Sequence, residues 1–121
     1  MQDHHRLGNW GEEAAERLLL SHGLTLIERQ FRTPLGEIDR IFRDGEVWVF
    51  VEVKTRAHLS DFPAVDAVTR AKRRRIISAA MMYMKKHRLE GQSMRFDIVL
   101  FEGDSYDWIV DAFEGSERYT Y

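Results

Sequence analysis

Apolar residues recur at two different spacings along the chain, and these spacings predict the order of its elements. Helical spacing runs from about residue 7 to residue 22, and Gly23 follows as a residue suited to the left-handed conformation that ends many helices. A second helical region is expected from Pro63 to about residue 87, and Gly91 ends it. The chain is therefore expected to contain two helices separated by a long stretch without helical periodicity.

Strand-like patterns fill the remaining parts of the chain, at residues 24–31, 35–43, 46–56, 94–101 and 106–113. The second and third of these are joined at Asp44-Gly45, which is a strong hairpin signal between two apolar stretches. The order helix, three strands, helix, two strands in 121 residues predicts one α/β domain. We expect a mixed central sheet flanked by helices on both sides.

The predicted hairpin gathers charged side chains on one face of the sheet. A two-residue turn at Asp44-Gly45 sets Glu37 directly opposite Glu52, and opposite residues of an antiparallel pair share a face. An odd-numbered loop or a bulge would break this arrangement. The charged face is expected to carry Glu37, Asp39, Glu52 and Lys54. The other face is expected to carry Ile38, Phe42, Val47, Val49, Val51 and Val53.

Residues 46–56 are apolar on both faces except at Glu52 and Lys54, which is the pattern of an interior strand. Carboxylates rarely enter such a strand without a partner, and Glu37 opposite Glu52 would add repulsion between like charges. A divalent cation would resolve this conflict, and rigid carboxylate oxygens suit Mg²⁺. The alternative is a buried network of ion pairs in which Lys54 neutralises one acid and no metal binds.

Composition narrows the range of functions. The chain has no cysteine, which excludes disulfides, thiolate zinc sites and cysteine nucleophiles and fits a cytoplasmic location. Its longest apolar run, residues 47–51, is far too short to span a bilayer, and no apolar stretch follows the first charges, so neither a membrane span nor a signal peptide is expected. The net charge of −2 argues against a protein that coats nucleic acid passively.

Basic residues nevertheless concentrate in residues 70–88. Lys72, Arg73 and Arg74 are expected to contact phosphates, with Lys72 nearest the cleft, although such a run also occurs as a solvated helix face. Thr55 and Arg56 directly follow the charged positions of the interior strand. These two residues are expected either to touch the bound nucleic acid or to cap the end of the strand.

The same positions carry a family resemblance. Asp39, followed thirteen positions later by Glu52-Val53-Lys54, resembles the D…(D/E)xK signature of the PD-(D/E)XK nuclease superfamily. Nearly the whole chain, about residues 7–113, is similar to the YraN-like family of predicted bacterial endonucleases, whose relatives include archaeal Holliday-junction resolvases. Residues 1–6 and 114–121 are expected to form a flexible N-terminus and a polar C-terminal tail. The segments that carry the similarity are Gly8-Asn9-Trp10-Gly11-Glu12-Glu13, Phe31-Arg32-Thr33, Gly36-Glu37-Ile38-Asp39, Val49-Phe50-Val51-Glu52-Val53-Lys54-Thr55-Arg56, Arg95-Phe96-Asp97-Ile98-Val99 and Asp111-Ala112-Phe113.

The resemblance implies a restriction-endonuclease-like fold and metal-dependent hydrolysis of phosphodiester bonds in DNA. It makes Asp39 and Glu52 the metal carboxylates, adds the carbonyl of Val53 to the inner shell, and makes Lys54 the catalytic lysine. Mg²⁺ would be the cofactor, with Mn²⁺ as its substitute. Glu12 matches the position of an additional acid in the resolvase-like relatives.

Several further expectations follow from the family. Glu37 belongs to the YraN-like motif and joins the expected catalytic set. The resolvase relatives point to branched or damaged DNA as substrate and to a homodimer, and no base-reading element predicts sequence specificity. Arg40 departs from the pattern, because an apolar residue is expected there; we predict that it lies near a sheet edge with its head in solvent. Asp97, between apolar neighbours, is expected to be buried with a backbone or arginine partner.

Two other hypotheses remain open. The chain could be a non-catalytic nucleic-acid-binding or adaptor module that keeps the nuclease fold, but its intact Asp39, Glu52 and Lys54 disfavour that reading. It could also be an enzyme that acts on a substrate other than nucleic acid, which the basic helix disfavours. Metal binding separates the nuclease from the adaptor, and salt-sensitive DNA binding separates both from the third hypothesis.

Overall fold

The computed structural model describes residues 2–56 and 64–115 and has the predicted order of elements. Helix α1 begins at Gln2, earlier than expected from the sequence. Pro63 and residues 116–121 lie outside the described residues. The elements are α1 (Gln2–Ser21), β1 (Thr25–Thr33), β2 (Gly36–Asp44), β3 (Val47–Arg56), the short 3₁₀ helix η1 (Ala64–Ala67), α2 (Arg70–Lys86), β4 (Met94–Glu102) and β5 (Ser105–Phe113).

The five strands form one mixed sheet in the order β1-β2-β3-β4-β5. Neighbouring strands are antiparallel except β3 and β4, which are parallel. A parallel pair needs a long crossover, and the segment containing η1 and α2 makes it. Strand β3 therefore lies in the middle of the sheet, which confirms the interior position predicted from its apolar pattern.

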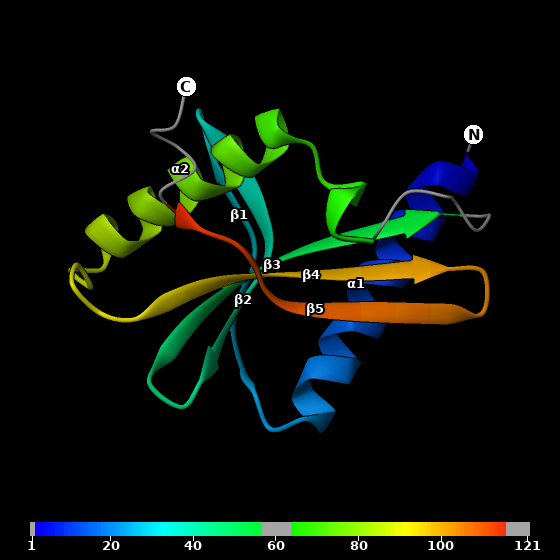
Figure 1. The fold of residues 1–121 in the computed structure, drawn as a ribbon, viewed down its shortest axis with the longest axis horizontal. Helices are drawn as coiled ribbons and strands as arrows, with labels where there is room; N and C mark the ends of the chain where they lie inside the picture. Colours follow the sequence, from blue (N-terminus) through cyan, green and yellow to red (C-terminus); the bar gives the residue numbers. More distant parts are fainter. Residues whose placement is uncertain (1, 57–63, 116–121) are drawn as a thin grey trace.

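The two long helices cover opposite faces of the sheet (Figure 1). On one face, Ala15 and Leu19 of α1 pack in a cluster with Phe42, Val49 and Val51. On the other face, α2 packs over a larger cluster, which includes Ile41, Phe50, Ile76, Ile77, Ala80, Tyr83, Phe96 and Ile98. This arrangement is a single α/β domain consistent with a restriction-endonuclease-like fold, as predicted.

The turn between β2 and β3 differs from the predicted one. Asp44 pairs with Val47, so the two turn residues are Gly45 and Glu46. Gly45 has φ of 61°, and a glycine at the first central position is the usual choice for a type II′ hairpin turn. The prediction that Glu37 faces Glu52 was therefore wrong. Ile41 pairs with Phe50, and the same register continued outward brings Asp39, not Glu37, opposite Glu52.

The face predicted for Ile38 was also wrong. Ile38 packs in the α2-side cluster together with Ile41, although strict alternation would place residues three positions apart on opposite faces. The interruption lies at Asp39. On the neighbouring strand, Gln30 has φ of 52°, and it lies between the pairs Arg29–Arg40 and Phe31–Ile38. The irregular backbone at this level separates Asp39 from the regular sheet.

Candidate functional site

Asp39 and Glu52 lie next to each other on the two central strands β2 and β3, and both are buried, with 8% and 7% of their surface exposed. Oδ2 of Asp39 accepts a hydrogen bond of 2.9 Å from the amide of Val53. The last residue pair formed between β2 and β3 is Arg40 with Val51. Beyond this pair, the amide of Val53 bonds to the side chain of Asp39 instead of to the main chain of β2. This contact holds the Asp39 carboxylate beside Glu52.

The two acids perturb each other strongly. Burial raises the pKa of Glu52 to about 8, the carboxylate of Asp39 adds to this rise, and Lys72 opposes it. Burial also raises the pKa of Asp39, while the amide of Val53 opposes the rise. Ionising both of two adjacent buried carboxylates costs much free energy unless a cation lies beside them. The protein without a bound cation therefore holds at least one proton on this pair near neutral pH.

Two lysines approach the acidic pair from the α2 side of the sheet. Nζ of Lys72, in the first turn of α2, lies 3.6 Å from Oε2 of Glu52. Lys54 follows Glu52 by two positions on β3, so its side chain leaves the same face, and it is exposed. A pocket of about 190 Å³ opens between these residues, and it is lined by Glu52, Lys54, Ala67, Val68, Thr69 and Lys72.

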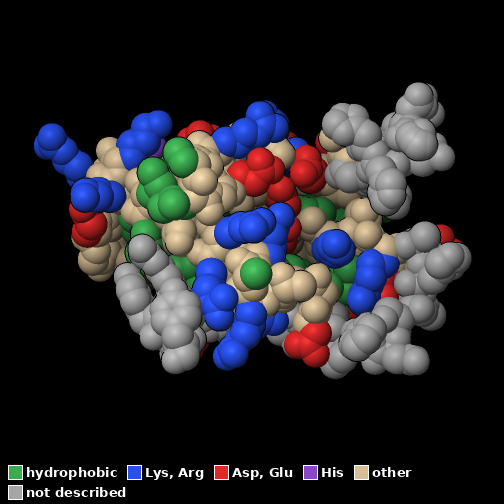
Figure 2. Space-filling view, turned by 90° about the horizontal axis from the view of Figure 1, so that it is seen from above, with side chains coloured by type: hydrophobic (Ala, Val, Ile, Leu, Met, Phe, Trp, Pro, Cys, Tyr) green, Lys and Arg blue, Asp and Glu red, His purple; other side chains and the backbone are tan. Residues whose placement is uncertain are grey.

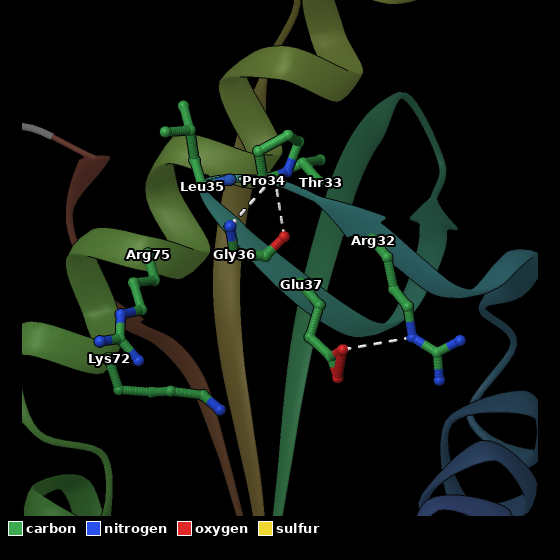
Figure 3. A pocket seen from close by; sticks show the side chains of 8 residues that line it. All are labelled: Arg32, Thr33, Pro34, Leu35, Gly36, Glu37, Lys72 and Arg75. Atoms are coloured by element: carbon green, nitrogen blue, oxygen red, sulfur yellow. Dashed lines mark hydrogen bonds and ion pairs between the residues drawn. The ribbon is translucent and has the colours of Figure 1, made fainter.

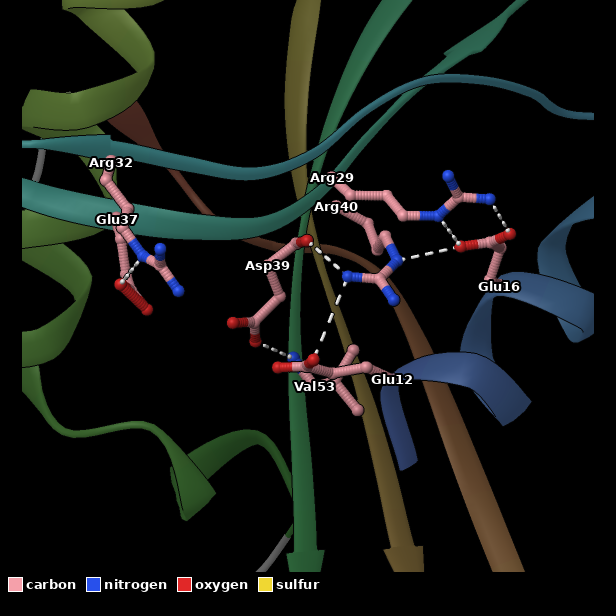
Figure 4. Close-up of polar contacts among 8 residues, drawn as sticks. All are labelled: Glu12, Glu16, Arg29, Arg32, Glu37, Asp39, Arg40 and Val53. Carbon is pink, nitrogen blue, oxygen red and sulfur yellow. Dashed lines mark hydrogen bonds and ion pairs between the residues drawn. The ribbon is translucent and has the colours of Figure 1, made fainter. Parts of the chain in front are cut away.

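A third acid reaches the pair from α1. Burial raises the pKa of Glu12, and the carboxylate of Asp39 raises it further, in part through a hydrogen bond between the two side chains. Figure 4 shows Glu12 beside Asp39, below the guanidinium of Arg40. The distance from NH1 of Arg40 to Oε1 of Glu12 is 3.8 Å. Glu12 thus lies beside Asp39, and its role as an additional acid of the site stays a prediction.

Arg40 is not at a sheet edge with its head in solvent, so that prediction was wrong. Only 5% of the residue is exposed, and β2 is an inner strand. Its Nε donates to Oε1 of Glu16 at 2.9 Å, and its NH1 donates to the carbonyl of Asp39 at 2.9 Å. The signal for this contact is the i, i+4 spacing of Glu12 and Glu16, which puts two acids on one side of α1.

Helix α1 lies very close to the sheet at Gly11. A Cβ added there would lie 2.5 Å from Cγ2 of Thr55. Thr55 therefore packs under α1, on the face of β3 opposite to Glu52. Arg56 forms an ion pair of 2.8 Å with Glu102 on β4. The sequence left open whether these two residues touch nucleic acid or finish the strand, and their contacts agree with the second role.

The basic residues at the start of α2 have different contacts. Lys72 is brought to the acidic pair, whereas Nε of Arg73 donates to the carbonyl of Val68 at 3.0 Å and its guanidinium lies over the ring of Phe113. Arg74 is half-buried.

Glu37 lies away from Glu52 and forms an ion pair of 3.3 Å with Arg32, although its charge still contributes to the raised pKa of Asp39.

A larger pocket of about 530 Å³ next to the acidic pair is lined by Arg32 and Arg75. Arg32 was not selected from the sequence, whereas Arg75 belongs to the basic run that was expected to contact phosphates. Arg32 belongs to the Phe31-Arg32-Thr33 segment of the family resemblance, and that membership was the only signal for it. Arg75 is one of four consecutive basic residues, and their order alone does not say which of them face the sheet edge.

Asp97 has the buried environment that was predicted for it. The residue is fully buried, and Arg95 donates to its Oδ1 at 3.0 Å. Nε1 of Trp108 and the amide of Asp111 donate to it as well, at 3.0 Å and 2.9 Å. Both an arginine and a backbone partner are therefore present. These contacts satisfy the carboxylate, so its role is to join β4 to β5.

The donors at the acidic pair fit a hard divalent cation. Mg²⁺ typically binds to one or two protein carboxylates and keeps several waters, and Asp39 and Glu52 offer two carboxylates whose raised pKa values fall when a cation binds. Across residues 2–56 and 64–115, no three or more His, Asp or Glu side chains gather as a complete set of metal ligands. The pair would thus hold a cation together with water and the carbonyl of Val53.

Comparison with known proteins places the chain in a family. The model of the uncharacterised protein family UPF0102 matches residues 11–101, which include all three acids of the site and Lys54. The chain belongs to family UPF0102. Among its relatives are UPF0102 proteins from Alkalilimnicola ehrlichii, 45% identical over 91% of this chain and 88% of that protein, and from Shewanella amazonensis, 43% identical over 88% of this chain and 97% of that protein.

A further UPF0102 relative, from Aeromonas hydrophila, is 45% identical over 88% of this chain and 83% of its own length. The relatives thus share nearly the whole domain, including both strands that carry the acidic pair. Within the described part of the chain, neither helix has the length and apolar character that crossing a membrane requires.

Proposed function

We propose that this member of family UPF0102 is a metal-dependent endonuclease that hydrolyses phosphodiester bonds in DNA. The observation that carries the proposal is the side-by-side burial of Asp39 and Glu52, with raised pKa values, at a pocket lined by Lys54 and Lys72. Burying two like charges together destabilises a fold, so a protein that keeps them has a use for them. Binding a divalent cation is the use that fits oxygen donors on rigid strands.

Each residue of the site has a distinct task under this proposal. Bound Mg²⁺ would polarise a phosphate oxygen and lower the pKa of a water. The amide of Val53 holds Asp39 in one orientation, so no reorganisation is needed when substrate arrives. Lys54 is exposed at the pocket mouth, where its ammonium can stabilise charge that develops on phosphorus. Lys72 partly neutralises Glu52 before a cation binds and can then turn toward a phosphate.

Glu12 extends the acidic pair toward α1. Burial and its hydrogen bond with Asp39 raise the pKa of Glu12, so Glu12 keeps a proton and donates it toward the Asp39 carboxylate. Arg40 and Glu16 fix the helix that carries Glu12. No base-reading element lines the pocket, so we propose cleavage without sequence specificity. Branched or damaged DNA as the preferred form and a homodimer as the acting unit are proposed from the resemblance to the resolvases alone.

A second candidate is a non-catalytic nucleic-acid-binding module on the same fold. The ion pair between Lys72 and Glu52 favours it, because this contact partly neutralises Glu52 without any metal. Lys72 opposes the raised pKa of Asp39 without cancelling it, however, and the pKa of Glu12 is raised as well. The incomplete neutralisation favours the enzyme.

A cleavage assay tests the proposal. The purified protein is incubated with single-stranded, duplex, flapped and four-way-junction DNA, with Mg²⁺, with Mn²⁺ or with EDTA. The proposal predicts metal-dependent products from at least one substrate, and loss of those products in Glu52→Gln. No cleavage of any substrate, together with DNA binding that weakens with salt, would instead establish the non-catalytic module.

A further inference from the structure

The tip of the β1–β2 hairpin and the first turns of α2 enclose a hollow of about 530 Å³. This volume lies in the range of about 300–1,000 Å³ that small-molecule ligands occupy, so it accommodates more than one phosphate group. Figure 3 shows Lys72 and Arg75 projecting from α2 on one side, and Arg32 with Glu37 on the other. The complete lining is Arg32, Thr33, Pro34, Leu35, Gly36, Glu37, Lys72 and Arg75.

The charge of this hollow favours an anion. Three of its residues are cationic and one, Glu37, is acidic. The side chain of Arg32 is 72% exposed and that of Glu37 42% exposed, and an ion pair of 3.3 Å at such a surface contributes little. Arg32 can therefore exchange Glu37 for a phosphate at low cost. Arg75 is exposed, and Lys72 is half-exposed and also lies 3.6 Å from Glu52, so a ligand in the hollow meets both Arg residues directly and Lys72 at its inner end.

Both walls of the hollow are held rigidly. Oγ1 of Thr33 accepts hydrogen bonds from the amides of Leu35 and Gly36 and donates to the carbonyl of Gly36. A Cβ added at Gly36 would lie 2.5 Å from the carbonyl oxygen of Arg75, so β2 and α2 meet here without space for a side chain. The turn amides are occupied, which leaves the side chains to bind the ligand. Rigid walls reduce the entropy lost on binding.

The hollow is continuous with the acidic pair. Lys72 lines both this hollow and the small pocket that holds Glu52 and Lys54. A chain of phosphates lying in the hollow would therefore reach Lys72 and then Glu52. Figure 2 shows the face of the molecule on the α2 side, where Lys and Arg side chains gather across the middle beside a smaller acidic group. A polyanion with regularly repeated charges matches this arrangement better than a compact anion does.

We propose that Arg32, Lys72 and Arg75 bind the backbone phosphates of the nucleic acid that flank the bond to be cut. This inference rests on the proposed function and deepens it, because it names the surface that holds the substrate. Recognition through the backbone alone would be independent of sequence. The inference moves the phosphate contacts from Arg73, which folds back on the core, to a hairpin tip far from it in the sequence.

Salt-dependent binding tests the inference without requiring cleavage. Fluorescence anisotropy measures the binding of the full chain to a labelled short DNA duplex and to the same strand alone, in EDTA, between about 50 and 200 mM salt. The test variant is Arg32→Gln with Arg75→Gln. The matched control is Arg17→Gln with Lys85→Gln, which removes the same charge from exposed positions that line neither pocket.

The test variant is expected to bind at least about tenfold more weakly at low salt and to lower the slope of log K against log salt by roughly 1.8, because each lost phosphate contact removes about 0.9. The control is expected to change both values by less than half as much. Wild-type binding in the test variant, or equal losses in both variants, would overturn the inference. If the double variant melts lower than wild type, Arg32→Gln alone is measured, with half the change in slope.

The outcome is separable from that of the nuclease proposal. Cleavage by the wild type with unchanged binding in the test variant would overturn the phosphate surface and leave the nuclease intact. Absence of cleavage by the wild type, with binding lost in the test variant and kept in the control, would do the reverse.

Discussion

The carboxylate of Asp39 accepts a hydrogen bond from the amide of Val53. This bond replaces main-chain pairing between β2 and β3, which ends at the pair Arg40–Val51. The contact has a structural and a chemical consequence. It satisfies an amide on the central strand, and it fixes the position of the Asp39 carboxylate. The structural consequence is the satisfied amide, and the chemical consequence is the carboxylate charge held beside Glu52. The two can be separated, because an asparagine side chain keeps an acceptor oxygen but loses the charge.

Asp39→Asn and Asp39→Ala are expected to differ in stability but not in activity. Both should lose more than about a hundredfold in cleavage rate, since even outer-shell changes at metal sites cost about 10–100-fold. Asp39→Ala should also be less stable than Asp39→Asn by about 1–3 kcal/mol, because it leaves the Val53 amide without its acceptor. Urea denaturation in EDTA measures the difference. Equal stability of the two variants would show that the hydrogen bond contributes nothing.

The raised pKa of Glu52 makes stability depend on pH. The pKa is about 8 in the folded protein and 4.5 without burial, so between these values the folded state holds a proton that the unfolded state has lost. Stability from this group is therefore greatest below about pH 4.5 and is lost as pH rises through about 8. One pKa unit corresponds to about 1.36 kcal/mol, so the total effect is on the order of a few kcal/mol.

Melting temperatures in EDTA at several pH values test this relationship. Glu52→Gln should melt higher than wild type near pH 8 and show a flatter pH profile, because its side chain carries no charge to bury. The pKa of Glu16 is lowered chiefly by its hydrogen bond with Arg29, so the stability that Glu16 contributes is lost as pH falls. This dependence of stability on pH has the opposite sign to that of Glu52 and is present in both proteins. If the wild type had a higher melting temperature than Glu52→Gln at every pH, repulsion between Asp39 and Glu52 would not destabilise the fold, and the claim would be wrong.

Arg40 and Arg29 both bind to Glu16, yet their removal should have very different effects. Arg40→Met leaves Glu16 and Glu12 without their buried cation, and breaking a buried pair costs about 3–5 kcal/mol. Arg29→Gln removes a side chain that is 59% exposed, so its cost should stay below about 1 kcal/mol. Chemical denaturation at neutral pH gives both values. Similar losses in the two variants would contradict the buried role of Arg40.

The contact between Gly11 and Thr55 can be tested by compensation. Gly11→Ala should reduce stability by about 1–3 kcal/mol, because its Cβ would meet Cγ2 of Thr55 at 2.5 Å. Thr55→Ser removes that methyl group and should restore much of the loss in the double variant. Gly115→Ala is the control, because its Cβ would have ordinary contacts of 3.6 Å and 3.7 Å. A double variant no more stable than Gly11→Ala would place Thr55 elsewhere.

Much of the fold could be predicted from the sequence because helices and strands leave different apolar spacings. The order of elements, the interior position of β3 and the helices on both faces all followed from that pattern. The turn did not, since Asp44-Gly45 and Gly45-Glu46 both provide a glycine where a positive φ is needed. Ile38 was misplaced because nothing in the residue order announces the break in alternation at Asp39.

The site was predictable in part for a related reason. Asp39, Glu52 and Lys54 could be grouped because the predicted and the observed turn both have two loop residues, and any even-numbered loop leaves the same residues on one face. The contacts of Arg40 with α1, and the hollow lined by Arg32 and Arg75, join segments distant along the chain. Their partners depend on the angle at which a helix crosses the sheet, and local spacing does not contain that angle.

The central claim is that Asp39 and Glu52 are kept together to hold a divalent cation, and calorimetric titration of the metal-free protein with Mg²⁺ or Mn²⁺ tests it most directly. At about pH 7 the account predicts saturable binding with release of protons, since a bound cation lowers the raised pKa values of the pair. Glu52→Gln should show no saturable binding. Equal binding by both proteins, or none by the wild type, would contradict the claim.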